Sequence, residues 1–464
     1  MAVVGSESNP LRVAIIGSGP AGFYTVSNFM KIKDVHVEMD MYDRLPTPFG
    51  LVRAGVAPDH QKDKSVTRAY EKSAAYPGFR FLGNVEYGLH IHLDDLRRHY
   101  HQVIFTTGSP FDRNLGISGE HLEGSHSATE FVAWYNGHPD FADRQFDLTQ
   151  ENVVVVGMGN VAMDVARILC KTHAELAATD MADHALRVLQ QSKVRNVYIL
   201  GRRGPAQAAF TPPEIKEMGE FEEADVNVLA EEAMLDVASQ ALLDASQDKN
   251  TLKNVTAVQA YAVRENQRKP RQLYIRFLVS PTELIGEAGQ VQAVKINKNE
   301  LYTDDQGALK ARATTAEEII PAGLVFRSVG YRGKPLPDVP FNESWGTIAN
   351  HRGAITNNDG STVPGMYTAG WIKRGPSGVI GTNKTCAQET VGLMVADLAM
   401  NKHFQPTDTD PAAIEALVRS RQPDLVSYAD WKKVDLAELA AGDASNRPRV
   451  KISNVNEMLE LIRS

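Results

Sequence analysis

Cysteine is scarce in this sequence, and its scarcity argues against several kinds of chemistry. Of the 464 residues only Cys170 and Cys386 are cysteines, and no CxxC pair is present. A disulfide scaffold, an iron–sulfur cluster and a dithiol redox centre each need more cysteines or closer spacing. The sequence therefore supports none of these three.

Long apolar runs and an excess of positive charge are also lacking. No apolar run is long enough to span a membrane, and residues 1–10 are too short and too polar for a signal peptide, so we expect a soluble, cytoplasmic protein. The 49 basic and 57 acidic residues give a net charge of −8, which argues against general nucleic-acid binding. The length, with 43% hydrophobic and 23% charged residues, is typical of a globular protein of two or three domains.

The first informative motif lies near the N-terminus. An apolar run over residues 13–16 leads into Gly17, Gly19 and Gly22 in GxGxxG spacing, then a helical pattern and a strand that ends at Asp43. Gly17 would allow the turn, Gly19 would let the backbone approach a pyrophosphate, and Gly22 would let the helix pack on the strand. Asp43 would accept hydrogen bonds from ribose hydroxyls. The pattern predicts a dinucleotide site, and the alternative is a glycine-rich surface turn.

A second motif of the same kind begins at Asn152. Four valines predict a buried strand, Gly157 and Gly159 make the turn, and Ala162 stands in the place of the third glycine. Alanine is small enough for close helix packing, so the fingerprint is preserved. Two such units indicate either two dinucleotides, or one dinucleotide and a degenerate repeat.

The strand after the second motif ends in two arginines. An insert over residues 172–193 precedes the strand Val194–Leu200, which leads into Arg202 and Arg203 instead of an acidic residue. An acidic end would repel a 2′-phosphate, whereas paired guanidiniums can bind it through charge-assisted, bidentate hydrogen bonds. The second site is therefore predicted to bind NADPH, with a solvated basic turn as the alternative.

Four other stretches carry further expectations. The loop over residues 45–66 is rich in proline and glycine and should pack over the cofactor. The glycine loop Ser377–Thr382 and the helix Asn383–Ala399 should present free N–H groups to an anion, such as the electron-rich edge of a reduced flavin. We interpret the basic stretch Arg264–Gln272 as a solvated hairpin tip in preference to a docking site. The strand Val35–Met41 alternates apolar and charged residues, so one of its faces should be less covered.

Five segments together carry a family resemblance. In chain order they are GSGPAGFY, LPTPFGLVRAGVAPDH, GMGNVAMDVARIL, GRRGPAQAAFT and GWIKRGPSGVIGTNK. This set resembles the adrenodoxin reductase family of ferredoxin–NADP⁺ reductases, and the likeness covers most of residues 10–400. One departure is the pair Pro212–Pro213 before Glu214, although proline is tolerated in the first turn of a helix.

The resemblance implies an α/β fold with two Rossmann-like dinucleotide-binding domains. The FAD-binding domain is expected to be discontinuous, with a first segment over residues 1–109 and a second over residues 334–464. The NADP-binding domain, residues 110–333, would be inserted between them. Loop-like composition near Ser109 and proline-rich composition at residues 332–340 agree with two domain crossings. The tail beyond about Pro406 carries no signature that we can use.

The resemblance also implies which residues hold the cofactors. For FAD they belong to the first glycine turn, the loops around it and the Gly-Trp segment: Gly17, Gly19, Pro20, Ala21, Gly22, Asp43, Arg44, Leu51, Val85, Thr107, Gly108, Trp371, Gly378, Val379 and Ile380. For NADPH they belong mainly to the second turn and the arginine pair: Gly157, Gly159, Asn160, Val161, Arg202, Arg203, Glu214 and Gly378.

Three residues match family positions beside the flavin and the nicotinamide and are the candidate catalytic residues: His60, Asp164 and Glu214. We expect Asp164 to be an orienting partner, because hydride transfer itself moves no proton to a side chain. Without the resemblance, the ordinary interpretations are a surface or packing histidine for His60 and an acid favoured in the first turns of a helix for Asp164. No metal site is expected.

The implied reaction is hydride transfer from NADPH to flavin N5, followed by single-electron transfer to an acidic ferredoxin-type iron–sulfur protein. Lys31 and Lys216 match basic positions that face such a partner, and Arg268, Lys269 and Arg271 are added from the basic stretch. Two other classes stay open. An NADPH-linked flavin subunit of a larger enzyme, such as glutamate synthase, would be expected to bring cysteine-ligated clusters, which two distant cysteines cannot supply. A non-enzymatic NADPH sensor would fail to reduce a dye in a diaphorase assay.

Overall fold

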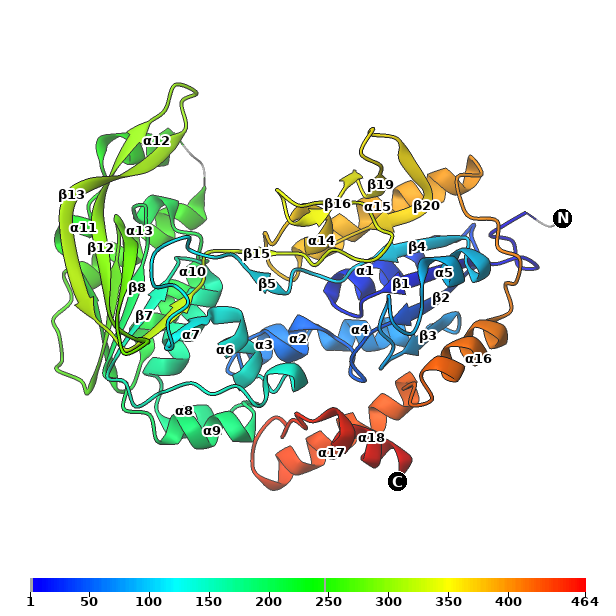
Figure 1. The fold of residues 1–464 in the computed structure, drawn as a ribbon, viewed down its shortest axis with the longest axis horizontal. Helices are drawn as coiled ribbons and strands as arrows, with labels where there is room; N and C mark the ends of the chain where they lie inside the picture. The colour runs from blue at the N-terminus through cyan, green and yellow to red at the C-terminus, as the bar shows by residue number, and fades with distance from the viewer. Residues whose placement is uncertain (1–2, 246–247) are drawn as a thin grey trace. The chain divides into compact units, whose positions relative to one another are not determined.

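The computed structural model describes residues 3–245 and 248–464, which form two compact units (Figure 1). Unit 1 consists of the chain up to Val56, His60–Phe111 and Tyr331–Ser464. Unit 2 consists of Ala57–Asp59 and Asp112–Gly330. At the two main crossings the short strands β5 (Phe111–Asp112) and β15 (Tyr331–Arg332) pair with each other. The chain therefore leaves unit 1 once for a long folded segment and then returns to it.

A seven-stranded sheet forms the centre of unit 1. In spatial order its strands are β18 (Asn350–His351), β19 (Ala354–Thr356), β20 (Thr362–Thr368), β4 (Gln102–Phe105), β1 (Leu11–Ile16), β2 (Val37–Tyr42) and β3 (Phe79–Leu82). The strands from β20 to β3 are parallel, and the remaining pairings are antiparallel. The carboxyl ends of the parallel strands therefore share one edge of the sheet, where dinucleotides bind in folds of this kind.

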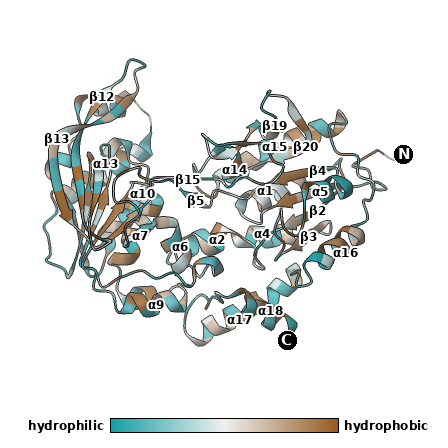
Figure 2. Ribbon diagram, viewed as in Figure 1, coloured by the Kyte–Doolittle hydropathy of each residue, from teal (hydrophilic) through white to brown (hydrophobic). Residues whose placement is uncertain are grey.

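Helices cover both faces of this sheet. They are α1 (Pro20–Phe29), α2 (Leu51–Ala54), α3 (Gln61–Lys64), α4 (Thr67–Ala74), α5 (Leu93–His99), α14 (Trp371–Arg374), α15 (Thr382–Ala399), α16 (Pro411–Arg421), α17 (Tyr428–Ala444) and α18 (Val455–Arg463). Because side chains alternate along a strand, Val13 and Ile15 join one apolar cluster with residues of α1 and α15, whereas Ala14 and Ile16 join another with residues of α5 and α16. In Figure 2 the strands of this sheet are among the more apolar parts of unit 1.

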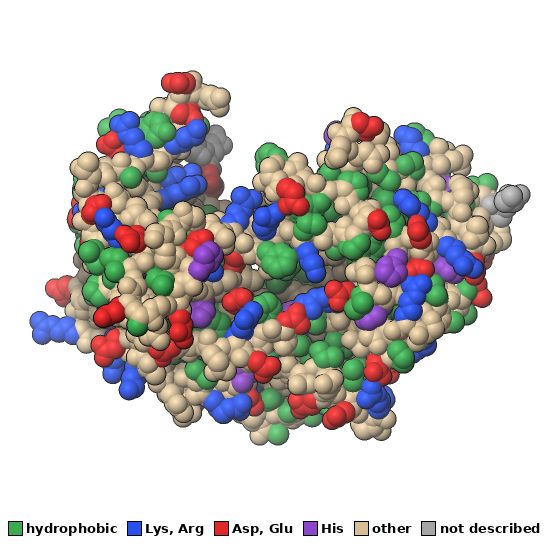
Figure 3. Space-filling view, viewed as in Figure 1, with side chains coloured by type: hydrophobic (Ala, Val, Ile, Leu, Met, Phe, Trp, Pro, Cys, Tyr) green, Lys and Arg blue, Asp and Glu red, His purple; other side chains and the backbone are tan. Residues whose placement is uncertain are grey.

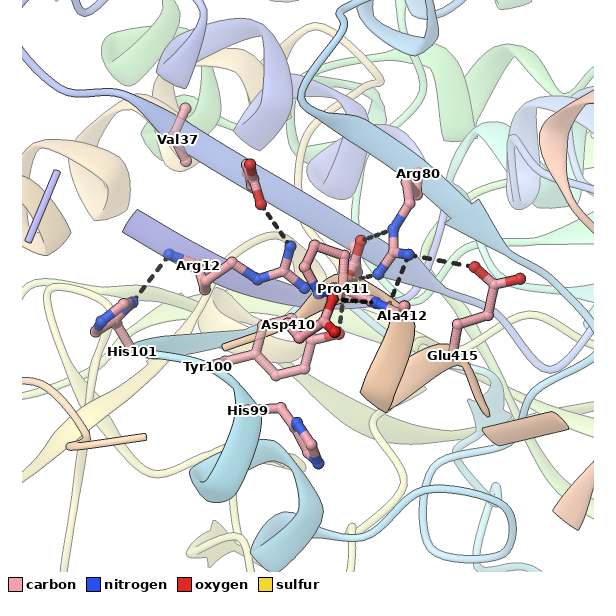
Figure 4. A network of polar contacts seen from close by, with 12 residues as sticks. Arg12, Val37, Arg80, His99, Tyr100, His101, Asp410, Pro411, Ala412 and Glu415 are labelled. Carbon is pink, nitrogen blue, oxygen red and sulfur yellow. Dashed lines mark hydrogen bonds and ion pairs between the residues drawn. The ribbon is translucent and has the colours of Figure 1, made fainter. Parts of the chain in front are cut away.

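Arg12, Arg80 and Tyr100 lie close together in a polar network (Figure 4), in which they bind the charged residues of β2. Asp40 is 1% exposed and accepts hydrogen bonds from Arg12, Arg80 and the hydroxyl of Tyr100, at 2.7, 2.7 and 2.6 Å. Arg12 also binds Glu38 at 2.7 Å. The expectation of a less covered face was wrong at Asp40, because two guanidiniums offset the penalty of burying its charge.

Unit 2 contains a six-stranded parallel sheet. Its spatial order is β6 (Ser125–Ser127), β14 (Leu324–Arg327), β7 (Asn152–Val156), β8 (Asn196–Leu200), β10 (Arg271–Arg276) and β9 (Ala224–Val228). Its helices are α6 (Ala128–Tyr135), α7 (Asn160–Cys170), α8 (His173–Ala177), α9 (Asp183–Gln190), α10 (Pro212–Glu217), α11 (Ala230–Ala233), α12 (Val237–Ala245) and α13 (Lys249–Ala262). Val153 and Val155 pack with helical residues on one face of this sheet.

A three-stranded antiparallel sheet covers the other face of the parallel sheet. It consists of β11 (Val279–Glu287), β12 (Gln290–Thr303) and β13 (Leu309–Pro321). Val154 and Val156 of the parallel sheet pack against Val294 and Ile296 of β12. The chain passes from β10 into this second sheet through Leu278, whose φ is +55°. The backbone turns at this residue, so β10 and β11 belong to two different sheets although only two residues separate them.

Two connections in unit 2 bear on the sequence expectations. The insert over residues 172–193 folds as α8 and α9, so it lengthens the path between the two halves of the second motif without interrupting the sheet. The basic stretch Arg264–Gln272 connects α13 to β10, and β10 is parallel to both of its neighbours. It is therefore not a hairpin tip, because a hairpin requires two consecutive antiparallel strands.

Candidate cofactor and active sites

The first glycine turn lies between β1 and α1 at the carboxyl edge of the unit 1 sheet. Gly17 has a φ of +106°, and an added Cβ there would lie 2.8 Å from the carbonyl oxygen of Thr106. At Gly22 an added Cβ would lie 2.4 Å from the carbonyl oxygen of Gly17, so only glycine allows this helix to approach the turn. An added Cβ at Gly19 would meet nothing within 4 Å. The turn is thus closed around Gly17 and Gly22 and open at Gly19, which fits a diphosphate approaching the backbone there.

Asp43 binds this turn directly. Its Oδ2 accepts hydrogen bonds from the backbone N–H and the hydroxyl of Ser18 at 2.8 and 2.6 Å, and its Oδ1 accepts from the N–H of Leu45 at 2.9 Å. The sequence predicts a ribose acceptor at this position but contains no sign of the contact with Ser18. This carboxylate therefore fixes the loop that a dinucleotide would approach, and a ribose would share it with Ser18.

The other residues expected around FAD follow the carboxyl ends of neighbouring strands in unit 1. They are Pro20 and Ala21 after β1, Arg44 after β2, Val85 after β3, and Thr107 and Gly108 after β4. Leu51 begins α2 and is 45% exposed, and His60 is the residue before α3. Gly108 has a φ of +75°, and an added Cβ would meet nothing within 4 Å, so this loop also leaves room for a ligand.

The Gly-Trp segment belongs to the same unit. An added Cβ at Gly370 would lie 2.6 Å from the Cβ of Ala21, so this segment packs directly on the start of α1. Trp371 stacks on Tyr331 with ring centroids 6.1 Å apart. The indole Nε1 of Trp371 is buried and has no hydrogen-bond partner within the described part of the chain. A buried donor without an acceptor is costly, which fits a bound group that accepts from it.

The loop before α15 differs from expectation. Gly378 has a φ of +77°, and the N–H of Val379, which is 53% exposed, donates to the hydroxyl of Thr382 at 3.1 Å. The N–H groups of residues 382–384 donate to the carbonyls of residues 379–381, Ile380 among them, at 3.0 to 3.1 Å. The prediction of free N–H groups was therefore wrong for this first turn, because bonds to the third preceding residue use them.

The second glycine turn, in unit 2, repeats the geometry of the first. Gly157 has a φ of +136°, and an added Cβ there would lie 2.0 Å from the carbonyl oxygen of Ser328. At Gly159 an added Cβ would meet nothing within 4 Å. The side chain of Asn160 accepts from the N–H of Thr211 at 2.9 Å, and Val161 packs at the edge of the core. This turn is also open at its middle glycine, as a site for a second dinucleotide requires.

Arg202 and Arg203 follow β8 beside this turn. Within the described residues neither guanidinium makes an ion pair with a carboxylate, although the chain is acidic overall. Burial and the neighbouring charge of Arg202 lower the pKa of Arg203 below its usual value. Two adjacent cations without a carboxylate partner suit an external dianion such as a phosphate.

A residue that the sequence analysis missed holds the backbone of this arginine pair. Asn299 lies on β12 next to an irregularity in the pairing with β13, and it is 9% exposed. Its Nδ2 donates to the carbonyl oxygen of Arg202 and to the hydroxyl of Ser280, each at 2.8 Å. The N–H of Leu278 donates to the carbonyl oxygen of Arg203 at 3.2 Å. The antiparallel sheet therefore fixes the conformation of the turn that carries the two arginines.

Asp164 and Glu214 are brought together in unit 2 by a second missed residue, Arg167. Its guanidinium is 1% exposed and donates to Asp164 at 2.6 Å and to Glu214 at 2.9 Å. It also binds both oxygens of Asp59 at 2.9 and 3.1 Å, and Lys171 binds Asp59 at 2.9 Å. Burial alone would raise the pKa of Asp59, but these cations outweigh it and lower that pKa well below its usual range.

Sequence spacing offered one signal for Arg167, since it stands one helical turn after Asp164 on α7. Its contact with Asp59 had no such signal, because 108 residues separate the two. Glu214 lies in the first turn of α10, which begins at Pro212 as the tolerance for proline in that turn allows. His60, the third candidate catalytic residue, belongs to unit 1.

The candidate docking residues differ in accessibility. Lys216 is 79% exposed at its side chain and lies 3.7 Å from Glu220, and Lys31 donates to Asn28 at 3.2 Å. In the basic stretch, Arg268 is exposed, but Lys269 donates to the carbonyl of Phe221 at 2.7 Å and the Arg271 side chain is only 18% exposed. Lys269 and Arg271 thus make contacts within their own unit, and a docking role for these three residues stays a prediction.

Two further observations concern the whole described chain. Cys170 and Cys386 are both buried and form no disulfide. None of the helices in residues 3–245 and 248–464 combines the length and apolar character that crossing a membrane requires.

Two glycine turns, each at the carboxyl edge of a parallel sheet, define a protein that binds two dinucleotides. Residues 11–263 match the family model of pyridine nucleotide-disulphide oxidoreductases. NADPH-ferredoxin reductase FprA of Mycobacterium leprae is 44% identical over 455 residues, which cover 97% of this chain and 98% of that protein. The mitochondrial NADPH:adrenodoxin oxidoreductase of Arabidopsis thaliana is 37% identical over 465 residues, with coverages of 98% and 96%.

A solved structure agrees with these relatives. Mycobacterium tuberculosis FprA in complex with NADPH superposes with a TM-score of 0.93 at 42% identity, over 98% of this chain and all of that one. The chain belongs to the pyridine nucleotide-disulphide oxidoreductase family and, more narrowly, to the adrenodoxin reductase-type ferredoxin–NADP⁺ reductases. It is therefore an oxidoreductase, and the predicted α/β fold is confirmed.

Proposed function

We infer that this chain is an FAD-dependent reductase that takes electrons from NADPH and passes them to a ferredoxin-type iron–sulfur protein. One observation carries the inference: both glycine turns are open at their middle glycine, and only the second is followed by two arginines that have no carboxylate partner among residues 3–245 and 248–464. Different dinucleotides therefore suit the two turns. FAD fits unit 1 and NADPH fits unit 2.

Unit 1 would hold FAD through its turn and the Gly-Trp segment. The backbone at Gly19 would meet the diphosphate, Asp43 would accept from a ribose hydroxyl beside Ser18, and the indole N–H of Trp371 would donate to the flavin end. When bound, FAD supplies the ability to accept a hydride and to release electrons one at a time. The protein's share is to bind and orient the cofactor.

Asp164 and Glu214 are proposed to orient the nicotinamide end of NADPH. Because each accepts a charged hydrogen bond from Arg167, both are held as hydrogen-bond acceptors. Hydride transfer requires no proton from a side chain, so the two carboxylates need not act as acids. His60 is proposed to contact the flavin, and we further propose that the protein works in the cytoplasm.

Binding of a ferredoxin partner requires a local cluster of basic residues on this acidic protein. The chain has a net charge of −8, and on the face shown in Figure 3 basic and acidic side chains are interspersed. An acidic ferredoxin therefore needs a focused basic site, for which Lys31 and the exposed Lys216 are the proposed residues. Arg268 is the next candidate.

The test is reconstitution. Purified protein should be yellow with bound FAD and should reduce cytochrome c with NADPH only when a ferredoxin is added, because the ferredoxin carries the electrons onward. Ferricyanide or a dye should be reduced without ferredoxin. Correctly folded protein that takes up no FAD would overturn the proposal, and a protein that binds NADPH without reducing any dye would be a sensor instead of an enzyme.

Charge reversal tests the docking residues. Lys31→Glu with Lys216→Glu should slow ferredoxin-dependent cytochrome reduction at low salt, and the deficit should shrink as salt screens the charges. Activity from NADPH to ferricyanide should stay near that of the wild type. A parallel loss of ferricyanide activity would show that the lysines support the fold or the flavin site instead.

A further inference from the structure

We propose that the C-terminal segment with helices α17 and α18 stabilises FAD binding. Glu438 binds Arg53 and thereby positions the loop of residues 49–53, which would lie beside the flavin diphosphate. The proposal rests on the proposed FAD site in unit 1 and deepens it. The sequence of this tail carries no motif. Its side chains nevertheless contact a loop that lies 385 positions earlier in the sequence. All of the contacts below lie within unit 1.

The central contact is a buried, two-point ion pair between α2 and α17. The Nη1 and Nη2 of Arg53 donate to the two carboxylate oxygens of Glu438 at 2.7 and 2.5 Å. The Glu438 side chain is 0% exposed and that of Arg53 is 9% exposed. Parallel hydrogen bonds of this kind fix the angle between two groups as well as their distance. Glu438 therefore defines where Arg53 lies.

Glu438 is itself held in place by the tail. It accepts from Arg449 at 3.0 Å and from the N–H of Ile452 at 2.9 Å. Burial alone would raise the pKa of Glu438, but Arg53 and Arg449 outweigh it, and the pKa lies below its usual value. The carboxylate is thus charged, saturated with donors and rigid, as a positioning group must be.

The tail also contacts the backbone of Arg53 and the ring of Phe49 in the same loop. Lys451 donates to the carbonyl oxygen of Arg53 at 3.1 Å. The guanidinium of Arg53 lies over the ring of Trp431, 5.1 Å from its centroid, and Phe49 meets the same ring edge-on at 6.2 Å. Four residues of the tail, Glu438, Lys451, Trp431 and Arg449, therefore act on the loop of residues 49–53 directly or through one another.

This loop touches the first glycine turn. The N–H of Phe49 donates to the carbonyl oxygen of Ser18 at 3.0 Å, and an added Cβ at Gly50 would lie 2.9 Å from the Cα of Gly19. Phe49 has a φ of +84°, which is rare for a bulky residue and persists only where the surroundings enforce it. The packing of Trp431 and the pairing of Arg53 on either side supply that enforcement. The tail thereby fixes the backbone that lies beside Gly19.

The experiment measures FAD release from the purified holoenzyme. In Glu438→Gln the side chain keeps its size but loses its charge, and one of its groups becomes a donor facing Arg53. We expect FAD to dissociate at least about tenfold faster, seen as the rise of free-flavin fluorescence at fixed temperature, with activity restored by added FAD. Lys451→Met should speed release in the same direction, and it serves as the second variant if Glu438→Gln folds poorly.

Asp424→Asn is the matched control. Asp424 pairs with Arg463 in the same tail at 2.5 Å, but the two side chains are 42% and 58% exposed and do not contact the loop. Its FAD release should equal that of the wild type. The proposal would be overturned if Glu438→Gln and Lys451→Met lowered the melting temperature but released FAD at the wild-type rate, or if Asp424→Asn released it equally fast. Wild-type protein without FAD would instead overturn the proposed function, and this inference with it.

Discussion

Arg167 is the buried cation whose removal should disturb unit 2 most. Its side chain is 1% exposed and binds Asp59, Asp164 and Glu214 at 2.6 to 3.1 Å. In Arg167→Met these carboxylates would remain buried together, and Lys171 would still bind Asp59. Removing one partner of a buried ion network costs about 3–5 kcal/mol. The local stability of α7 should fall by that amount at pH 7.5.

Hydrogen exchange of α7 measures this loss without requiring the whole chain to unfold. A loss of about 3–5 kcal/mol corresponds to amide exchange in α7 that is faster by roughly two to more than three orders of magnitude. Arg144→Met is the control, because Arg144 and Glu130 form an ion pair at 3.2 Å in the same unit with side chains 53% and 31% exposed. An exposed pair of this kind contributes about 1 kcal/mol or less.

The effect should also depend on pH with a defined sign. The pKa of Asp59 is lowered in the folded protein, so its contribution to stability is full above the unfolded value of about 4 and is lost as the pH falls through the folded value. Without Arg167 the pKa of Asp59 would be higher, so the variant would take up protons at a higher pH than the wild type. The difference between wild type and variant should therefore shrink at pH 5. Exchange in Arg167→Met within tenfold of the wild type at pH 7.5 would refute the reasoning.

Three further predictions concern nucleotide choice and acid stability. Replacing Arg202 and Arg203 with alanine should raise the KM for NADPH at least about tenfold with far less effect on NADH, and equal losses would show that the pair is structural. Asn299→Ala should lower the ratio of NADPH to NADH activity by about fivefold, whereas Asn297→Ala, which loses only a bond to Thr314 on the same sheet, should leave the ratio unchanged. Burial and the nearby charges of His403 and Arg12 lower the pKa of His101 to about 4, so the unfolded chain binds a proton there first as the pH falls below about 6.5. The free energy of unfolding of unit 1, measured with urea, should therefore fall by about 2 kcal/mol between pH 7 and pH 4.5. His101→Gln should make this free energy depend less on pH, and a pH dependence equal to that of the wild type would contradict the prediction.

Local patterns in the sequence predicted the parts of the fold that local physics controls. The apolar runs before Gly17 and Gly157 predicted buried parallel strands, and the glycine spacings predicted turns whose φ values and close contacts only glycine allows. The change from Asp43 to Arg202 at the end of the second strand predicted different nucleotides from charge alone. In each of these cases the residues that matter lie within a few dozen positions of one another.

Tertiary structure decided what the charged residues do. Asp40 appeared to mark an uncovered face, but Arg12 and Arg80 meet it from two other strands and bury it. Lys269 is a candidate docking cation, and only the fold shows that its ammonium group also donates to a carbonyl of its own unit. Whether a charge is exposed, paired or buried depends on which distant segment packs beside it. The amino-acid composition does not predict which segments pack together.

The tail gives the clearest case. Its three helices, α16, α17 and α18, were not predicted from the sequence, and nothing in their residues indicates a cofactor site. Glu438 and Arg53 are 385 positions apart, and each alone is an ordinary charged residue. By themselves the glycine turns in the sequence indicated either two dinucleotides or one dinucleotide and a degenerate repeat, and the arginine pair after the second turn favoured two. Only the packing of α17 against α2 decided which residues hold the loop in place over one of them, because an ion pair between distant segments exists only after the chain has folded.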